Sequence, residues 1–550
     1  METSQQMTGF HTTSSPSGQL IASIASGKLR ICASHAPERF TEINIRIQPK
    51  DVTALKWNED GDQVAVSSHR LIEVVDLLDN GHRIRLDNGS GGLGKFASAD
   101  FINADQLLVI WEFGKTKIWN LANGKSMDLS DCKTTCMGDK WRLRPKAKKA
   151  TTQTQTLAAL SRSGTDDVLQ ILLPALQKAI KSMKLQTIDA QSLSWSPDGR
   201  WLAVLDTPTA STSVNFYTPD GHPFRSYPAS TDSSHFGLGI KSVSWAGNSQ
   251  IVGLTRFDGQ IVLLNTLTFT PLAVIEHHTV IHQSSASSDQ QAPIWQEIVA
   301  ASGERSYTPI LQPFSPPLSR TKASSEPGEL GVAEACFSCD GAFLASRDER
   351  MLNTVWVWDT ASLGAHAVVV QHSNVRSMHW HPSRPDTLLL DCGEAIAYLF
   401  NAASPREPPT AQPFSLPGSP SLSWLATQAN ALPTILCATK SSFQLLYPEG
   451  RPEPDTNTDA GADTSVLSGP ADEEGNDSLL DMLSGRTPLP PRTEQSYTER
   501  IDIEVDEEDT DSTTRMDDTF RGKQVFGRRS GPGSGRISEA RDPLDDSQIF

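Results

Sequence analysis

The sequence of 550 residues has no long apolar run and little cysteine. No stretch approaches the roughly 18 apolar residues that a membrane-spanning helix needs. Residues 1–19 have neither the basic start nor the apolar run of a secretion signal. We therefore expect that the protein neither spans a membrane nor is secreted. The seven cysteines are scattered and odd in number, which does not fit a disulfide framework and favours a reducing compartment.

Positive charge is also scarce. The formal net charge is −17, and residues 451–550 carry 24 acidic and 11 basic side chains, or −13, which leaves −4 for residues 1–450. Phosphate binding needs clustered positive charge, so this balance argues against nucleic acid as the main partner. Hydrophobic residues make up 37% of the chain, which indicates that part of it has no packed core.

Motifs for nucleotide or metal binding are incomplete. Residues 89–95 have the glycine and lysine spacing of a phosphate-binding loop, but Phe96 stands where that loop needs Ser or Thr. Residues 96–101 also read as a strand, whereas the loop must open a helix. The pairs Cys132/Cys136 and Cys336/Cys339 have no histidine at zinc-ligand spacing, and we expect buried or turn cysteines there.

Catalytic patterns are missing as well. No Gly-x-Ser-x-Gly elbow is present. His277, His278 and His282 form a small cluster without a paired carboxylate or nucleophile, so we expect structural roles for these histidines. We predict a protein that is not an enzyme and has no cofactor and no metal site.

One unit recurs through the first 450 residues. It consists of an apolar strand that ends in an aromatic residue, a turn, and further apolar strands, and its clearest copies are residues 193–204 and 335–346. Asp-Gly turns between such strands are typical of hairpins. The closing strands of successive units are anchored at Cys32, Val75, Trp119, Leu172, Tyr217, Leu264, Trp358, Phe400 and Tyr447.

Most intervals between successive anchors are close to the repeat length of about 40–45 residues that is typical of four-stranded propeller blades. The interval between Leu264 and Trp358 is twice as long and contains residues 276–330, which are rich in Ser, Gln and Pro. We interpret this segment as an insertion that adds one strand, around residues 306–313. The unit at residues 157–173 is eroded.

The repeat predicts an all-β fold, a WD40-type β-propeller, in residues 1–447. We expect about seven to nine degenerate blades, in one ring or in two, because nine units are traceable whereas a ring commonly holds about four to eight. Residues 448–550 read as a disordered acidic tail. The signature residues of the blades are Trp119, Trp195, Trp245, Trp356, Trp358 and Asp359. A buried indole N–H needs an acceptor.

Two segments are candidates for protein contacts. A basic run, whose cations are Lys140, Arg142, Arg144, Lys146, Lys148 and Lys149, could meet an acidic surface, although a solvated loop is the simpler interpretation. In the tail, Leu479, Leu480 and Leu483 would form one apolar edge of a short helix. Thr487 precedes a proline, and Thr510 and Ser512 lie among acidic residues, so these three are candidate phosphorylation sites.

The order of the repeats resembles the centrosomal and spindle-pole WD-repeat family of WRAP and "WD repeat eight" proteins, in particular a fungal-like member. The resemblance covers residues 10–447 and is most specific from Phe236 to Phe400, including the run Asn353-Thr-Val-Trp-Val-Trp-Asp359. It departs from the family at Cys339, where the proline of the turn is missing. The acidic tail is not part of the shared pattern.

This resemblance implies a non-catalytic scaffold in the cytoplasm and cytoskeleton, at the spindle pole body or centrosome. It implies a coiled-coil spindle-pole anchoring protein and a kinesin-14 motor as partners, with a gamma-tubulin complex or microtubules as further candidates. The alternative from the sequence is a WD40 adaptor or substrate receptor in another multiprotein complex, such as one for protein modification.

Overall fold

Short apolar runs separated by tight turns form antiparallel strands throughout the described chain. At two of the Asp-Gly turns, Gly199 and Gly341 have φ values of 68° and 79°, in the left-handed region that such turns require. The computed structural model describes residues 2–78, 83–88, 94–129, 131–133, 138–146, 155–174, 178–208, 213–228, 238–282, 291–318, 330–425 and 432–451. The chain divides into two units, Met1–Asp472 and Glu473–Phe550, and the described residues all belong to the first.

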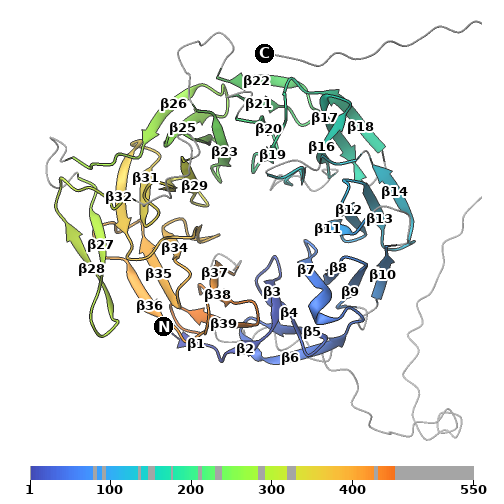
Figure 1. Ribbon diagram of the computed structural model, residues 1–550, viewed down its shortest axis with the longest axis horizontal. Helices are drawn as coiled ribbons and strands as arrows, with labels where there is room; N and C mark the ends of the chain where they lie inside the picture. The colour runs from blue at the N-terminus through green and yellow to red at the C-terminus, as the bar shows by residue number, and fades with distance from the viewer. Residues whose placement is uncertain are drawn as a thin grey trace, which may run out of the picture. The chain divides into compact units, whose positions relative to one another are not determined.

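The described strands form nine sheets that follow one another around a single ring (Figure 1). Each sheet is one blade, with its first strand innermost. The nine anchors expected from the sequence all lie in the third strand of successive blades. The prediction of a WD40-type β-propeller is therefore confirmed with nine blades, and the two-ring alternative is wrong.

The first three blades each have four strands. Blade 1 contains β3 (Phe10–Ser14), β4 (Leu20–Ala25), β5 (Lys28–Ala33) and β6 (Ala36–Asn44). Blade 2 follows a short 3-10 helix, η1 (Pro49–Asp51), and contains β7 (Val52–Trp57), β8 (Gln63–Ser68), β9 (Leu71–Asp76) and β10 (Arg83–Asp87). Blade 3 contains β11 (Phe96–Asn103), β12 (Gln106–Trp111), β13 (Thr116–Asn120) and β14 (Ser126–Leu129).

The next three blades repeat this plan. Blade 4 contains β15 (Trp141–Leu143), β16 (Leu157–Ser163), β17 (Asp166–Leu173) and β18 (Lys178–Lys184). Blade 5 contains β19 (Ser192–Trp195), β20 (Leu202–Leu205), β21 (Val214–Tyr217) and β22 (Pro223–Tyr227). Blade 6 contains β23 (Ile240–Trp245), β24 (Ile251–Arg256), β25 (Gln260–Asn265) and β26 (Pro271–Glu276). The unit that reads as eroded, blade 4, is thus a complete sheet.

The last three blades include the departures from the plan. Blade 7 contains β29 (Val332–Phe337), β30 (Phe343–Asp348), β31 (Thr354–Asp359) and β32 (Gly364–Val370), extended by β27 (Ile294–Val299) and β28 (Arg305–Ile310). Blade 8 contains β33 (Ser377–Trp380), β34 (Thr387–Asp391), β35 (Ile396–Asn401) and β36 (Thr410–Pro413). Blade 9 contains β37 (Ser421–Trp424), β38 (Ile435–Ala438) and β39 (Ser442–Tyr447), completed by β1 (Glu2–Thr3) and β2 (Met7–Thr8).

The insertion before blade 7 contributes two strands, not the one expected around residues 306–313. The hairpin of β27 and β28 adds to the outer edge of the blade, with β27 parallel to β32. The hairpin projects outward from the ring (Figure 1). A local pattern of β-rich residues cannot reveal this placement, because it depends on pairing with residues 74 positions later in the sequence, such as Ile294 with Val368.

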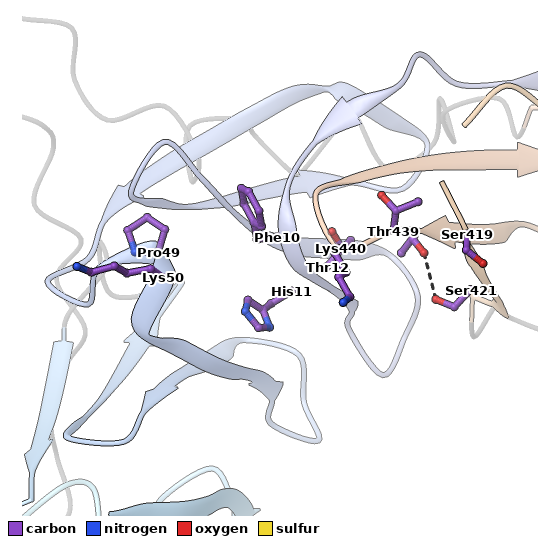
Figure 2. Close-up of a pocket in the computed structure, with 10 residues that line it drawn as sticks. Phe10, His11, Thr12, Pro49, Lys50, Ser419, Ser421, Thr439 and Lys440 are labelled. Carbon is purple, nitrogen blue, oxygen red and sulfur yellow. Dashed lines mark hydrogen bonds between the residues drawn. The ribbon is translucent and has the colours of Figure 1, made fainter. Parts of the chain in front are cut away.

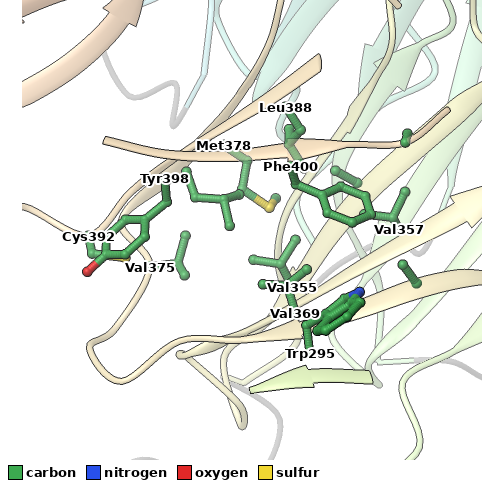
Figure 3. Close-up of a cluster of buried hydrophobic side chains, with 14 residues drawn as sticks. Trp295, Val355, Val357, Val369, Val375, Met378, Leu388, Cys392, Tyr398 and Phe400 are labelled. Carbon is green, nitrogen blue, oxygen red and sulfur yellow. The ribbon is translucent and has the colours of Figure 1, made fainter. Parts of the chain in front are cut away.

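The core of the ring consists of nine apolar clusters, one at each contact between neighbouring blades. In blade 7, Val355 and Val357 face blade 8, whereas Trp356 and Trp358 face blade 6. This alternation follows from the two-residue period of a strand. Figure 3 shows the cluster between blades 7 and 8, where Trp295 of the hairpin packs beside Val369. Each blade therefore depends on both of its neighbours.

The N-terminal segment closes the ring on blade 9. Glu2 lies opposite Tyr447, and Met7 lies opposite Phe443, so β1 and β2 provide the outer strand that blade 9 lacks. Cβ added at Gly9 would lie 2.7 Å from the Ser23 side chain, so the chain passes into blade 1 where only glycine fits. Blade 9 is thus built from the two ends of the propeller sequence.

The residue after the inner strand caps the following turn in several blades. In blade 2, Asn58 Oδ1 accepts hydrogen bonds from the N–H groups of residues 61, 62 and 63. In blade 7, Ser338 Oγ accepts from Phe343 N–H and donates to Asp340. In blade 8 the same position holds His381, whose Nδ1 accepts from the N–H groups of Ser383 (3.1 Å) and Arg384 (3.0 Å). The missing proline at Cys339 therefore does not prevent this turn.

The capping role of His381 predicts acid sensitivity. Burial lowers the pKa of His381 to about 4, from an ordinary value of 6.5. The folded protein therefore binds fewer protons than the unfolded one between these values, so the stability is present above about pH 6.5 and is lost as the pH falls toward 4. We expect His381 to reduce the free energy of unfolding by about 1–2 kcal/mol between pH 7 and pH 5.

The variant His381→Asn tests this, because an amide oxygen can cap the turn, as Asn58 does, without titrating. Denaturant unfolding at pH 7 and pH 5 should give a smaller loss for the variant than for the wild-type chain. Equal losses would contradict the prediction.

Candidate protein-interaction surfaces

The strand with the strongest repeat signature anchors a buried polar network. Trp358 Nε1 donates to Ser346 Oγ at 2.7 Å, and Ser346 Oγ lies 2.8 Å from His277 Nε2. His277 Nδ1 donates in turn to the carbonyl of Gly259, in a turn of blade 6, at 2.9 Å. Burial lowers the pKa of His277, which favours this neutral form of the ring. The network ties blade 7 to blade 6, so His277 has a structural role, as expected for this cluster.

Two other signature tryptophans have a buried indole N–H without an acceptor among the described residues. Trp356 stacks on Trp358 with ring centroids 5.4 Å apart, but its Nε1 has no hydrogen-bond partner among the described residues. The same holds for Trp119 Nε1. The expectation that each buried indole N–H finds an acceptor is therefore wrong at these two positions. Their packing against apolar neighbours keeps them in place, since burial of such large aromatic surface outweighs one unmade hydrogen bond.

Asp359 ends the strand of Trp358 and caps the turn that follows. Its carboxylate accepts hydrogen bonds from Ala361 N–H (2.9 Å) and from Ser362 Oγ (2.8 Å). Partial burial alone would raise the pKa of Asp359, but these hydrogen bonds hold it below its ordinary value. Asp359 thus acts locally, in the turn between the third and fourth strands.

Trp195 and Trp245 lie elsewhere, at the ends of inner strands. They belong to a set of five inner-strand tryptophans whose indole N–H groups each donate to the inner strand of the preceding blade. The pairs are Trp57 with Thr13 O (3.3 Å), Trp195 with Arg142 O (3.2 Å), Trp245 with Ser194 Oγ (3.1 Å), Trp380 with Cys336 O (2.9 Å) and Trp424 with His379 O (2.8 Å). These bonds fix the spacing of neighbouring inner strands around the ring. Part of the sequence signal was available, because Trp57, Trp195, Trp245 and Trp380 each lie just before the tight connection to the second strand of their blade.

The described part of the basic run lies at the end of the inner strand of blade 4. Arg142 pairs with Asp139, and Lys146 Nζ lies 2.7 Å from a carboxylate oxygen of Glu59 in blade 2. Arg144 Nε donates to the carbonyl of Gly199 at 2.7 Å. Lys140 makes no ion pair with the described residues. The other two cations, Lys148 and Lys149, lie outside the described residues. Exposed pairs such as these are worth about 0–1 kcal/mol, so an acidic partner could still compete for them.

The hairpin of blade 7 is held by a buried carboxylate. Glu297 is fully buried and pairs with Arg305 at 3.2 Å, while its other oxygen accepts from His372 N–H at 2.7 Å. Arg305 also reaches Glu394 of blade 8, at 3.1 Å. Trp295 Nε1 donates to the carbonyl of Pro405 at 2.9 Å. These contacts hold the hairpin firmly against blades 7 and 8 and leave its outer strand, β28, paired with β27 alone among the described strands.

A pocket of about 840 Å³ lies where blades 9, 1 and 2 meet, and we call it the seam pocket. Its walls come from the start of β3, from η1, from the start of β37 and from the turn between β38 and β39 (Figure 2). Lys50, Lys440 and His11 are its basic lining residues, and Phe10 contributes an exposed ring. No carboxylate is among its lining residues. The sequence gives no signal for it, because its walls are far apart along the chain.

The described residues at the remaining candidate sites do not form a nucleotide-binding loop or a metal site. The strand β11 follows the glycine-rich segment directly, where a phosphate-binding loop would open a helix. Cys336 is half-buried and donates weakly to Met378 O, burial raises the pKa of its thiol, and Cys339 is exposed. Within the described ranges, no group of three or more His, Cys, Asp or Glu side chains could hold a metal ion. The same part of the chain has no helix long and apolar enough to cross a membrane.

The candidates in the tail are not part of the described structure. Leu479, Leu480, Leu483, Thr487, Thr510 and Ser512 all fall outside the described residues. They stay predictions.

Two substitutions separate the hydrogen bond of Trp358 from its packing. Trp356→Phe and Trp358→Phe remove similar volumes from the same cluster, but only Trp358→Phe removes a hydrogen bond. We expect Trp358→Phe to lower the free energy of unfolding by about 1–2 kcal/mol more than Trp356→Phe. Denaturant unfolding of the two variants measures the difference, and equal losses would mean that the Trp358–Ser346 bond contributes nothing.

Comparison with known proteins gives two clear relatives. The chain is 26% identical to the WD repeat-containing protein WRAP73 of Mus musculus over 367 residues, which cover 64% of this chain and 76% of that protein. It is also 26% identical to an uncharacterized WD repeat-containing protein of Schizosaccharomyces pombe over 332 residues, or 60% of this chain and 64% of that protein. No protein-family model matches the sequence.

Solved structures with a similar fold include a eukaryotic initiation factor, with a TM-score of 0.47 and 10% identity over 74% of this chain and 88% of that one. The C-terminal WD40 domain of Sif2 has a TM-score of 0.41 and 12% identity, over 71% of this chain and 94% of that one. Saccharomyces cerevisiae Sqt1 has a TM-score of 0.41 and 11% identity, over 81% of this chain and 97% of that one. The repeats, the Trp358 network and the two relatives identify the chain as a member of the WD-repeat proteins, with a fungal relative among its matches.

Proposed function

We propose that this WD-repeat protein is a non-catalytic scaffold at the spindle pole or another microtubule-organising centre. The observation that carries the proposal is the closed ring itself. Both faces of each blade are buried against its neighbours. A partner protein can therefore bind only at the turns on the two faces of the ring and at the outer strands. Rigid surfaces of this kind suit the docking of extended or helical peptides.

The proposed location has separate support. The residues from Phe236 to Phe400 resemble the centrosomal and spindle-pole WD-repeat family, and WRAP73 of mouse is a relative at 26% identity. On this proposal the chain helps to anchor microtubule minus ends in a complex with a coiled-coil anchoring protein and a kinesin-14 motor. A gamma-tubulin complex or microtubules would be further contacts of the same assembly.

The second candidate is an adaptor or substrate receptor in another multiprotein complex. The hairpin of β27 and β28 supports this alternative, because it is a firmly held extension of blade 7 and the outer edge of β28 has no partner strand in the described structure. Such an edge can accept an added strand from any partner. It does not require a location at the pole.

Tagging the endogenous protein and following it through mitosis beside a spindle-pole marker separates the two. We expect a focal signal at the poles throughout division, and a coiled-coil protein and a kinesin-14 motor among the proteins that co-purify. A diffuse or nuclear signal would contradict the proposal and favour the adaptor. Purified protein that retains a nucleotide or a metal ion would contradict the non-catalytic role.

A further inference from the structure

We propose that the seam pocket binds an extended acidic peptide of a partner protein. The proposal deepens the scaffold function, because it names one docking site and the chemistry of its ligand. The pocket lies on the face of the ring where the chain enters the inner strands, and its walls come from blades 9, 1 and 2. Three observations support it: the charge of the walls, an unusual backbone at His11, and the size of the pocket.

The charged groups of the pocket have a single sign. Lys50 and Lys440 stand on opposite walls, both exposed, and neither makes an ion pair with a described residue. By contrast, Lys28 and Lys56, exposed elsewhere on blades 1 and 2, each pair with a carboxylate at 2.9 and 3.0 Å. Two unpaired lysines at one pocket, with no carboxylate among its lining residues, attract a ligand with carboxylates or phosphorylated side chains.

The backbone of β3 is distorted at the pocket wall. The pairing of β3 with β4 is irregular between Phe10 and Thr13, and His11 has a φ of 53°, which is uncommon for a residue other than glycine. Bulges of this kind often lie beside binding sites and redirect side chains. Here the hydroxyl of Thr12, which lines the pocket, is buried without a hydrogen-bond partner. A ligand that reaches this hydroxyl would satisfy it.

The size and remaining walls favour a peptide over a small anion. A volume of about 840 Å³ is large for an isolated phosphate or carboxylate. Phe10, 46% exposed, offers a ring for an apolar side chain, and Ser419, Ser421 and Thr439 add hydroxyl groups. Among the described strands, β3 pairs with β4 alone, and the carbonyl of Thr13 on β3 accepts from Trp57 Nε1, so only the start of its other edge, at the pocket, is open to an extended chain. A strand that alternates acidic and apolar residues would meet both kinds of wall.

The test uses the full chain and a fluorescein-labelled peptide of 12 residues in which glutamate alternates with valine. We expect saturable binding by fluorescence anisotropy that weakens as salt is added. The double variant Lys50→Glu/Lys440→Glu should bind at least about tenfold more weakly, because two attractive contacts become repulsive. Thr12→Val should also weaken binding without lowering the thermal stability, because it removes an unpartnered hydroxyl.

The matched control is Lys125→Glu, which reverses the charge of an exposed lysine in a turn between β13 and β14 of blade 3. It should bind like the wild-type chain. Equal binding of the double variant and the control, equal binding of a peptide with glutamine in place of glutamate, or preferential binding of anionic vesicles or an oligonucleotide would each overturn the proposal.

The chain carries acidic residues of its own beyond Arg451. Binding that is seen only after residues 452–550 are removed would assign the pocket to this segment and overturn the proposal of a partner's peptide. Because the assay uses purified protein, its failure would leave the location at the spindle pole open to its own test.

Discussion

The contact between neighbouring blades is the interaction on which the rest of the structure depends. Each sheet buries one face against the preceding blade and the other against the following blade, and nine apolar clusters result. No blade is stable by itself, because a single small sheet would leave both of its apolar faces in water. The ring must therefore close, and it closes where β1 and β2 pair with β39.

The candidate surfaces lie where the repeat plan is interrupted. The seam pocket is formed at the closure, where blade 9 takes its outer strand from the start of the chain. The hairpin of β27 and β28 is an addition to blade 7 that the ring does not need for closure. In the regular blades the apolar side chains pack against neighbouring blades. The seam pocket and the hairpin have, in addition, side chains and a strand edge that this packing does not use. A scaffold of this design combines a rigid frame with a few specific contacts.

Much of the frame could be predicted from the sequence, and little of the surface could. The anchors from Cys32 to Tyr447 identify the third strand of all nine blades, because strand and turn signals are local. The hairpin on β32 and the closure on β39 involve pairing between distant segments, which no local pattern shows. The same reason hides the seam pocket, whose walls come from both ends of the propeller sequence. Trp119 and Trp356 were expected to find acceptors because indole N–H groups usually do, and only the packed structure shows that theirs do not.

The closure can be tested directly with a chain that lacks residues 1–9. This deletion removes the pairing of β1 and β2 with β39, including the hydrogen bonds of Ser4 with Gln444 and Leu445. We predict a loss of roughly 3–5 kcal/mol in the free energy of unfolding, from several backbone hydrogen bonds and the packing of Met7. A synthetic peptide of residues 1–9 should restore part of the loss when it is added in excess. An unchanged unfolding midpoint would contradict a ring closed by the N-terminal segment.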